Sequence, residues 1–178
     1  MSKYHIRNIT FIALYVSLVL GFFYNEDLNG GAKGDFLAYL NIIKDLNNDF
    51  LDAFLNYERY GDRHSPLSSI LLSQLFNFNL TEFSIRFINL NISIAIIFFF
   101  YKCLKIVFND VDKYFLQLLT LVIFLSPTFR SLSIWPDSRI HGLLFFLISL
   151  LYFLKFIHEE KNSRYIFLNS LFLVISSY

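Results

Sequence analysis

The chain is poor in charged residues, cysteine, glycine and proline. Only 16% of its 178 residues are charged, whereas about a quarter is usual for a soluble domain. One cysteine, six glycines and three prolines exclude a disulfide scaffold, a collagen-like repeat and a Pro/Gly-rich disordered chain. The formal net charge of +1 gives no reason to expect nucleic-acid binding.

Apolar residues are abundant instead. They make up 56% of the chain, which has 23 phenylalanines and a mean hydropathy of +0.51. A soluble fold would leave much of this apolar surface in water, where large patches promote aggregation. The composition therefore predicts an all-α integral membrane protein. Its Phe/Ile/Asn/Lys bias favours a bacterial inner (plasma) membrane.

Long apolar stretches with few or no Asp, Glu, Lys or Arg residues predict the membrane spans, because a bilayer core needs roughly 20 mostly apolar residues per helix. The predicted spans cover residues 8–24, 84–104, 114–133 and 140–157, and a further apolar run covers residues 165–178. No small-residue cleavage site follows the first span, which predicts an uncleaved anchor. Because the last run ends without a polar flank, we expect a single membrane domain that is the N-terminal part of a longer polytopic bundle.

Basic residues in the short loops predict the orientation. They gather before the first span and around the ends of the second and fourth, at Lys3, Arg7, Lys102, Lys105, Lys113, Lys155, Lys161 and Arg164. This places the N-terminus in the cytoplasm and residues 25–83 in an outer loop. The spans alternate only if residues 65–80 do not cross the membrane, so we expect an interfacial helix there.

The outer loop contains an amphipathic pattern. Its apolar residues recur at steps of three and four, at Phe36, Leu40, Ile43, Leu46, Phe50, Phe54 and Tyr57. The pattern predicts a helix along the membrane surface, broken near Asn47 and Asn48. Such a helix either packs on the bundle or guides a lipid.

Ionisable residues at the outer membrane boundary are candidates for function, because charge is costly there. The first group is NEDLNGGAKGDF, in which Asp35 begins the amphipathic pattern. Asp35 is either a helix N-cap or a functional carboxylate. Glu26 and Asp27 are interpreted as a solvated flank.

The second group is YGDRHSPL. Arg63 and His64 precede a proline-led helix start. They either hold a phosphate through charge-assisted bonds or anchor the chain to lipid headgroups.

The third group is SIWPDSRIHG. Asp137 and Arg139 either pair with each other or serve a site, and Trp135 is interpreted as an interfacial belt residue. His141 is interpreted as a satisfied interior histidine. The sequence has no metal-ligand spacing, phosphate-binding glycine fingerprint or nucleophile elbow.

The order of these groups resembles the N-terminal part of the membrane glycosyltransferases called GT-C. The resemblance is to the branch related to protein O-mannosyltransferases and lipid A aminoarabinose transferases. The matching features are Asp35 in GGAKGDF, Arg63 and His64 in RHSPLSSILL, Arg86 in TEFSIRFINL, and Asp137 in SPTFRSLSIWPDSRIHGLLFF. The resemblance implies a GT-C helical bundle with an amphipathic surface helix in the first outer loop.

The resemblance also implies an activity. A sugar would move from a polyprenyl-phosphate donor to a lipid, glycan or protein acceptor at the outer face, with inversion. Asp35 would deprotonate the acceptor, and Arg63, assisted by His64, would stabilise the departing phosphate. Asp137 and Arg139 would bind substrate. Asp137 would position either the basic group or the acceptor, or would help to bind a divalent ion. The resemblance leaves metal use undecided. The alternatives are a non-catalytic polysaccharide export or flippase-like protein and an accessory membrane subunit.

Overall fold

The computed structural model describes residues 3–28, 30–61, 66–77, 81–158 and 161–177, and these form helices without strands. The elements are α1 (Lys3–Phe23), α2 (Ala32–Asn48), α3 (Phe50–Leu55), η1 (Tyr57–Tyr60), α4 (Leu67–Asn77), α5 (Glu82–Val107), α6 (Lys113–Leu121), η2 (Val122–Leu125), α7 (Pro127–Ile134), α8 (Ser138–His158) and α9 (Ser163–Ser177). The all-α class predicted from composition is thereby confirmed for the described chain.

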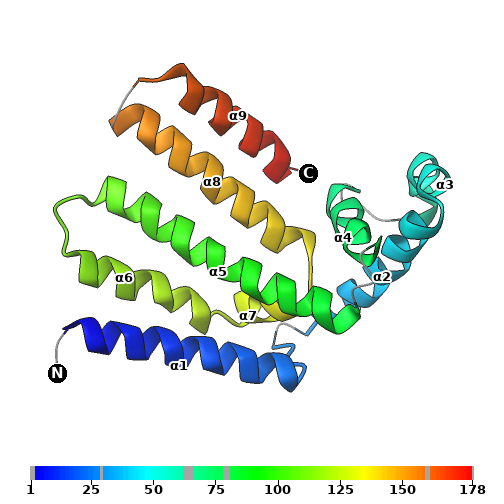
Figure 1. The fold of residues 1–178 in the computed structure, drawn as a ribbon, viewed down its shortest axis with the longest axis horizontal. Helices are drawn as coiled ribbons and strands as arrows, with labels where there is room; N and C mark the ends of the chain where they lie inside the picture. Colours follow the sequence, from blue (N-terminus) through cyan, green and yellow to red (C-terminus); the bar gives the residue numbers. More distant parts are fainter. Residues whose placement is uncertain (1–2, 29, 62–65, 78–80, 159–160, 178) are drawn as a thin grey trace.

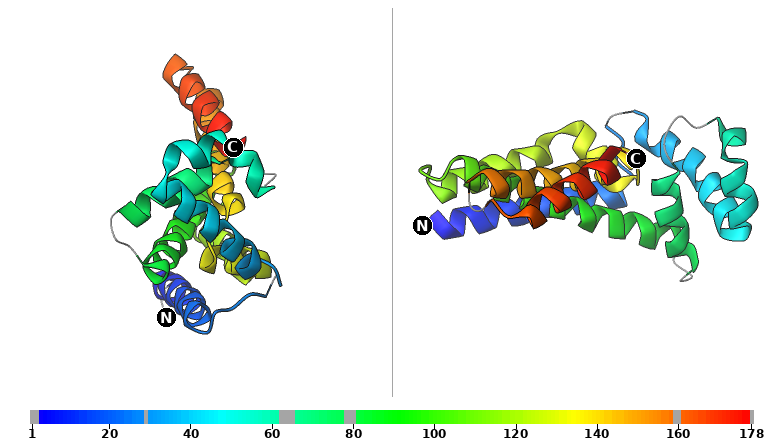
Figure 2. Two further views of the ribbon diagram at one scale, coloured as in Figure 1. Left: turned by 90° about the vertical axis from the view of Figure 1, so that its right-hand side faces the viewer. Right: turned by 90° about the horizontal axis from the view of Figure 1, so that it is seen from above.

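The helices form a bundle with an appendage at one end. Helices α1, α6, α5, α8 and α9 follow one another across the bundle with their long axes roughly aligned, while α2, α3 and α4 lie beyond one end (Figures 1 and 2). The largest buried cluster lies where α1, α5 and α7 meet, and includes Leu18, Phe22, Leu90 and Trp135. The bundle core therefore continues to the end that faces the appendage.

Two of the described helices, α5 and α8, are long and apolar enough to span a membrane. In their most apolar 18-residue windows only 28% and 22% of the residues are buried, and Phe87, Phe98, Phe146 and Phe153 are exposed. This distribution is typical of helices that face lipid rather than water. The apolar helix Asn8–Phe23 within α1 is shorter than these two.

The segment predicted as the third span is broken. Neither α6–η2 nor α7 is long enough by itself to span a membrane, but the two together are. They are bent by 72° relative to each other. Pro127 has no backbone N–H and is favoured at the start of a helix, and the Ser126 side chain accepts from the N–H of Phe129. The sequence therefore starts a new helix at this point instead of continuing the old one.

The amphipathic pattern in the outer loop forms α2, whose buried face includes Phe36, Leu40, Ile43 and Leu46. The predicted break is confirmed, because α2 ends at Asn48 and α3 begins at Phe50. The apolar residues of the pattern do not form one continuous buried face, however, because Phe50 and Phe54 on α3 are exposed.

Helix α4 packs against α2. It has 11 residues, well short of the roughly 20 that a crossing needs. The interfacial location expected for residues 65–80 stays a prediction.

An ion pair stabilises the far end of the appendage. Arg59 Nη1 donates to Asp52 Oδ2 at 2.6 Å, and Asn56 Nδ2 donates to Asp52 Oδ1 at 2.8 Å. Tyr60 donates its hydroxyl to Asp45 at 2.9 Å. Burial, more than any other cause, raises the pKa of Tyr60 above its usual value.

Acid should weaken this contact. Hydrogen bonding and charge from Arg59, followed by the bond from Asn56, hold the pKa of Asp52 below its usual 3.8. Because the folded pKa is lower than the unfolded one, the contribution to stability is present above pH 3.8 and is lost as the pH falls through the folded pKa. NMR titration of the Asp52 carboxyl should give a higher pKa in Arg59→Gln than in wild type. The exposed-site control Lys44→Gln should leave it unchanged, and equal values in wild type and Arg59→Gln would contradict the contact.

Candidate functional site

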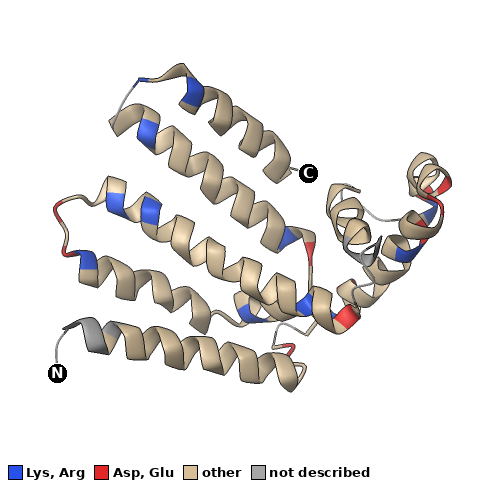
Figure 3. Ribbon diagram, viewed as in Figure 1, with Lys and Arg blue, Asp and Glu red and all other residues tan. Residues whose placement is uncertain are grey.

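A charged cluster lies where the bundle meets the appendage (Figure 3). Arg139 Nη2 donates to Asp35 Oδ2 at 2.7 Å and to Asp137 Oδ2 at 2.8 Å, and Arg139 Nε donates to Asp137 Oδ1 at 2.8 Å. We call these three residues the Arg139 cluster. One guanidinium thus bridges two carboxylates from segments that are about a hundred residues apart in sequence, 104 between Asp35 and Arg139.

The two carboxylates differ in exposure. The side chain of Asp137 is 2% exposed, whereas those of Asp35 and Arg139 are 51% and 47% exposed. Asp137 also accepts from the backbone N–H of Arg139 at 2.8 Å, directly before α8. The buried carboxylate therefore orients the guanidinium, and the exposed one is accessible to a ligand.

Asp35 is not the N-cap of α2, so the capping interpretation of this residue is wrong. The N-cap position is Gly31, and Asp35 lies in the first turn with its N–H bonded to the Gly31 carbonyl at 2.9 Å. Its carboxylate is consequently directed to Arg139. The pairing of Asp137 with Arg139 that the sequence suggested is confirmed, and Asp35 joins it.

Beside this cluster a buried arginine stacks on Trp135. The guanidinium carbon of Arg86 lies 3.5 Å from the Trp135 ring centroid and 5.0 Å from that of Phe22. Arg86 Nε donates to the Ile134 carbonyl at 3.3 Å, while its Nη2 has no hydrogen-bond partner among the described residues. Trp135 is 2% exposed, so its interpretation as an interfacial belt residue is wrong.

Glu26 is not part of a solvated flank either. Arg130 donates from Nε and Nη2 to the two Glu26 carboxylate oxygens at 2.6 and 2.7 Å, and the side chains are only 11% and 16% exposed. Arg130 Nη2 also donates to the Ser17 carbonyl at 3.1 Å. The Glu26 carbonyl accepts from Trp135 Nε1 at 3.0 Å. The loop after α1 is thereby fixed to α7 through Arg130 and to Trp135, which directly follows α7.

His141 lies between two polar partners. Its Nδ1 is 3.0 Å from Ser68 Oγ of α4 and its Nε2 is 3.1 Å from Asn89 Oδ1 of α5. Asn89 Nδ2 donates to the carbonyls of Leu132 and Ser133, both at 2.9 Å. Because the Asn89 oxygen accepts, Nε2 carries the proton and Nδ1 accepts from Ser68. His141 is a satisfied interior histidine, as predicted.

Three of the five predicted site residues lie close together in the structure, and the other two lie outside the described residues. Asp35, Asp137 and Arg139 form one cluster, whereas Arg63 and His64 lie outside the described residues. Glu26 and Arg130 were not predicted as a pair. The signal available was Arg130 itself, since a cation inside a predicted span calls for a partner.

A role for a divalent ion at this site stays a prediction. No group of three or more His, Cys, Asp or Glu residues able to hold a metal occurs within the described part of the chain. The carboxylates of Asp35 and Asp137 both bind the Arg139 guanidinium, which fills the place between them that a cation would take.

Comparison with known proteins gives no family for the chain. No family model, curated protein or solved structure matches it. Function is therefore inferred from the charged site and from the resemblance to GT-C transferases.

The two carboxylates of the Arg139 cluster should differ in their effect on stability. Asp137→Asn removes a buried carboxylate and should lower the free energy of unfolding by about 1–3 kcal/mol. Asp35→Asn breaks a half-exposed pair and should change it by less than about 1 kcal/mol. Denaturant unfolding of the detergent-purified protein measures both. Equal losses in the two variants would mean that Asp137 does not orient the guanidinium.

A methyl group at Gly21 should break the Glu26–Arg130 pair. A Cβ there would collide with the Glu26 carboxylate and lie 3.1 Å from Arg130 Nη2. Gly21→Ala should therefore lower the free energy of unfolding by about 1–3 kcal/mol. The control is Gly34→Ala in α2, where a Cβ meets no described atom within 4 Å and the helix should gain about 0.5–1 kcal/mol. A stabilised Gly21→Ala protein would contradict the role of the pair.

Proposed function

We propose that this chain belongs to a multi-pass membrane glycosyltransferase of the GT-C type, which transfers a sugar from a polyprenyl-phosphate donor to a lipid, glycan or protein acceptor. The observation that carries the proposal is the half-exposed Asp35 carboxylate, which lies in the first turn of the amphipathic helix α2 and is oriented by Arg139 at the end of an apolar bundle. A donor with a long apolar chain and a polar head requires apolar and charged surfaces to meet in this way.

The proposed reaction is a single displacement. Asp35 accepts the proton of the acceptor hydroxyl, and the acceptor oxygen attacks the anomeric carbon. The bond from that carbon to the phosphate oxygen breaks, and the electron pair leaves with the polyprenyl phosphate. The anomeric configuration is inverted because attack and departure occur on opposite faces.

The other residues of the proposal position the reactants. Arg139 fixes the direction of the Asp35 carboxylate, and Asp137 fixes Arg139. Arg63 and His64 lie between η1 and α4 in sequence, and we assign them to the phosphate that gains charge as the sugar leaves. In this proposal the bundle lies in the bacterial inner membrane with its N-terminus in the cytoplasm, and the cluster lies at the outer face.

Loss of Asp35 tests the proposal. Membranes that contain the full-length protein, extended beyond Tyr178, are incubated with a panel of polyprenyl-phosphate sugars, and transfer is measured for wild type and Asp35→Asn. Removing a general base should reduce transfer by about 10²–10⁴-fold. The matched control is Asp110→Asn, an exposed carboxylate in the turn after α5, which should transfer at the wild-type rate.

The possible results separate the classes of function. Unchanged transfer by an inserted Asp35→Asn protein would remove Asp35 as the base. Absence of transfer by inserted wild type with every donor would favour the export, flippase-like or accessory alternatives.

A further inference from the structure

The other end of the bundle carries a basic cavity. Helices α5 and α8 contact each other, and a cavity of about 450 Å³ lies at their C-terminal ends, opposite the ends that carry Arg86 and Arg139. Blue ribbon segments, which mark Lys and Arg, lie at this end of α5 and α8 in Figure 3. The lining includes Lys102, Lys105, Lys155, His158 and Tyr101.

No carboxylate among the described residues neutralises this cavity. The ammonium group of Lys102 lies 4.8 Å from the Phe98 ring centroid and that of Lys155 lies 5.7 Å from the Tyr165 ring centroid. None of the three lysines forms an ion pair with another described residue. Glu159 and Glu160 follow in sequence and lie outside the described residues. Three cations that share one cavity repel one another and favour a bound anion.

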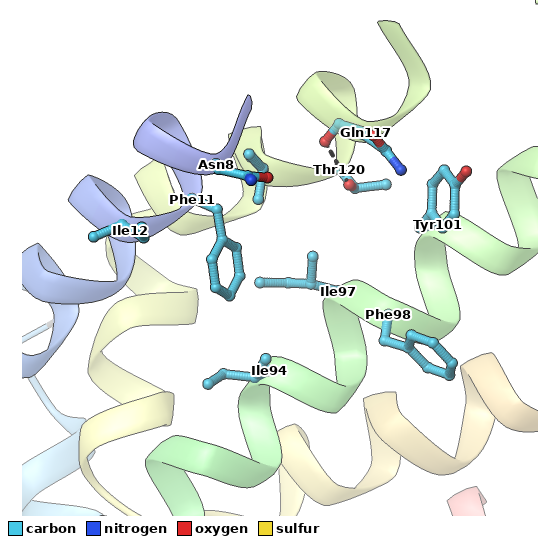
Figure 4. A pocket seen from close by; sticks show the side chains of 10 residues that line it. Asn8, Phe11, Ile12, Ile94, Ile97, Phe98, Tyr101, Gln117 and Thr120 are labelled. Atoms are coloured by element: carbon cyan, nitrogen blue, oxygen red, sulfur yellow. Dashed lines mark hydrogen bonds between the residues drawn. The ribbon is translucent and has the colours of Figure 1, made fainter. Parts of the chain in front are cut away.

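An apolar cavity begins at the same tyrosine. Tyr101 also lines a cavity of about 460 Å³ between α1, α5 and α6. Figure 4 shows Phe11 of α1 pointing toward Ile94 and Ile97 of α5, with Asn8, Gln117 and Thr120 gathered toward one end. A cationic cavity that shares its Tyr101 wall with an apolar one matches an amphiphile with an anionic head and a hydrocarbon chain.

We propose that the two cavities bind one anionic phospholipid. Its phosphate lies among Lys102, Lys105 and Lys155, and an acyl chain passes Tyr101 into the apolar cavity. Basic pockets between membrane helices are known sites for anionic headgroups, and the apolar cavity on the other side of Tyr101 favours a lipid over free phosphate. The proposal depends on the membrane location in the proposed function but not on sugar transfer.

Lipid binding can be measured directly. The purified protein is titrated in detergent with phosphatidylglycerol or with phosphatidylcholine of the same chain length, and retained lipid is measured by native mass spectrometry. Wild type should retain phosphatidylglycerol more tightly. Joint replacement of Lys102, Lys105 and Lys155 by Gln should weaken phosphatidylglycerol binding by about 10–100-fold, with circular dichroism to establish that the helices are intact.

A matched variant separates this site from the general charge at this end of the bundle. Lys113, Lys161 and Arg164 are exposed, lie at the α5–α6 and α8–α9 connections, and do not line the cavity. Their joint replacement by Gln removes the same charge and should leave the affinity close to that of wild type. Equal losses in the two triple variants would overturn the proposal, and so would equal retention of the two lipids by wild type.

Two further measurements keep the test decisive. Glycerol phosphate, a soluble headgroup analogue, should not displace phosphatidylglycerol at matched concentration, and displacement would overturn the lipid assignment. If the Gln triple variant loses helicity, Lys105→Gln alone should still weaken binding, and joint replacement of the three lysines by Arg should preserve it. A protein that binds phosphatidylglycerol but transfers no sugar would overturn the proposed function and leave this site intact.

Discussion

The pairing of Glu26 with Arg130 organises the end of the bundle that carries the Arg139 cluster. A guanidinium in largely apolar surroundings must find a counter-charge or hydrogen-bond acceptors, and Arg130 obtains them from the loop after α1. The same loop supplies the carbonyl that binds the Trp135 indole N–H. With Trp135 fixed, Arg86 can stack on its ring, and Asp137 follows two residues later. The loop after α1 and the connection between α7 and α8 are thus brought together by one charge pair and the hydrogen bond beside it.

The two ends of the bundle have different chemical characters. One end combines carboxylates with arginines in specific pairs, a pattern typical of sites that orient a reacting group. The other end presents lysines without described counter-charges, a pattern that attracts anionic surfaces. A donor or a lipid would therefore meet a different electrostatic environment at each end, while the apolar exterior between them is uniform.

Local pattern predicted the helices well and the long-range pairs poorly. The apolar runs predicted α5 and α8, and the steps of three and four predicted the buried face of α2 with its break. The sequence also placed Asp137 and Arg139 close enough to pair. It did not reveal that Asp35 joins them or that Glu26 binds Arg130, because each contact joins residues 104 positions apart. Periodicity reports which face of one helix is apolar, whereas such pairs depend on how several helices pack.

Short-range rules also failed where tertiary contacts outweighed them. An aspartate near a helix start is commonly a cap, yet a distant arginine binds Asp35. A tryptophan near a predicted membrane boundary is commonly interfacial, yet Trp135 is enclosed by Phe22, Phe36 and Arg86. In both cases the misjudged residue contacts a cation. Charged residues near the predicted span ends were therefore better guides to this site than the propensities of their neighbours.

The 72° bend before α7 has a consequence for the buried arginine. The last carbonyls of a helix lack partners within the helix and carry the negative end of its dipole. Because α7 ends within the bundle, its terminal carbonyls at Leu132, Ser133 and Ile134 are available to α5, and they accept from Asn89 and Arg86. A straight third helix would have directed these oxygens elsewhere. The bend thus gives Arg86 a partial counter-charge made of peptide groups, which no carboxylate in the sequence would have revealed.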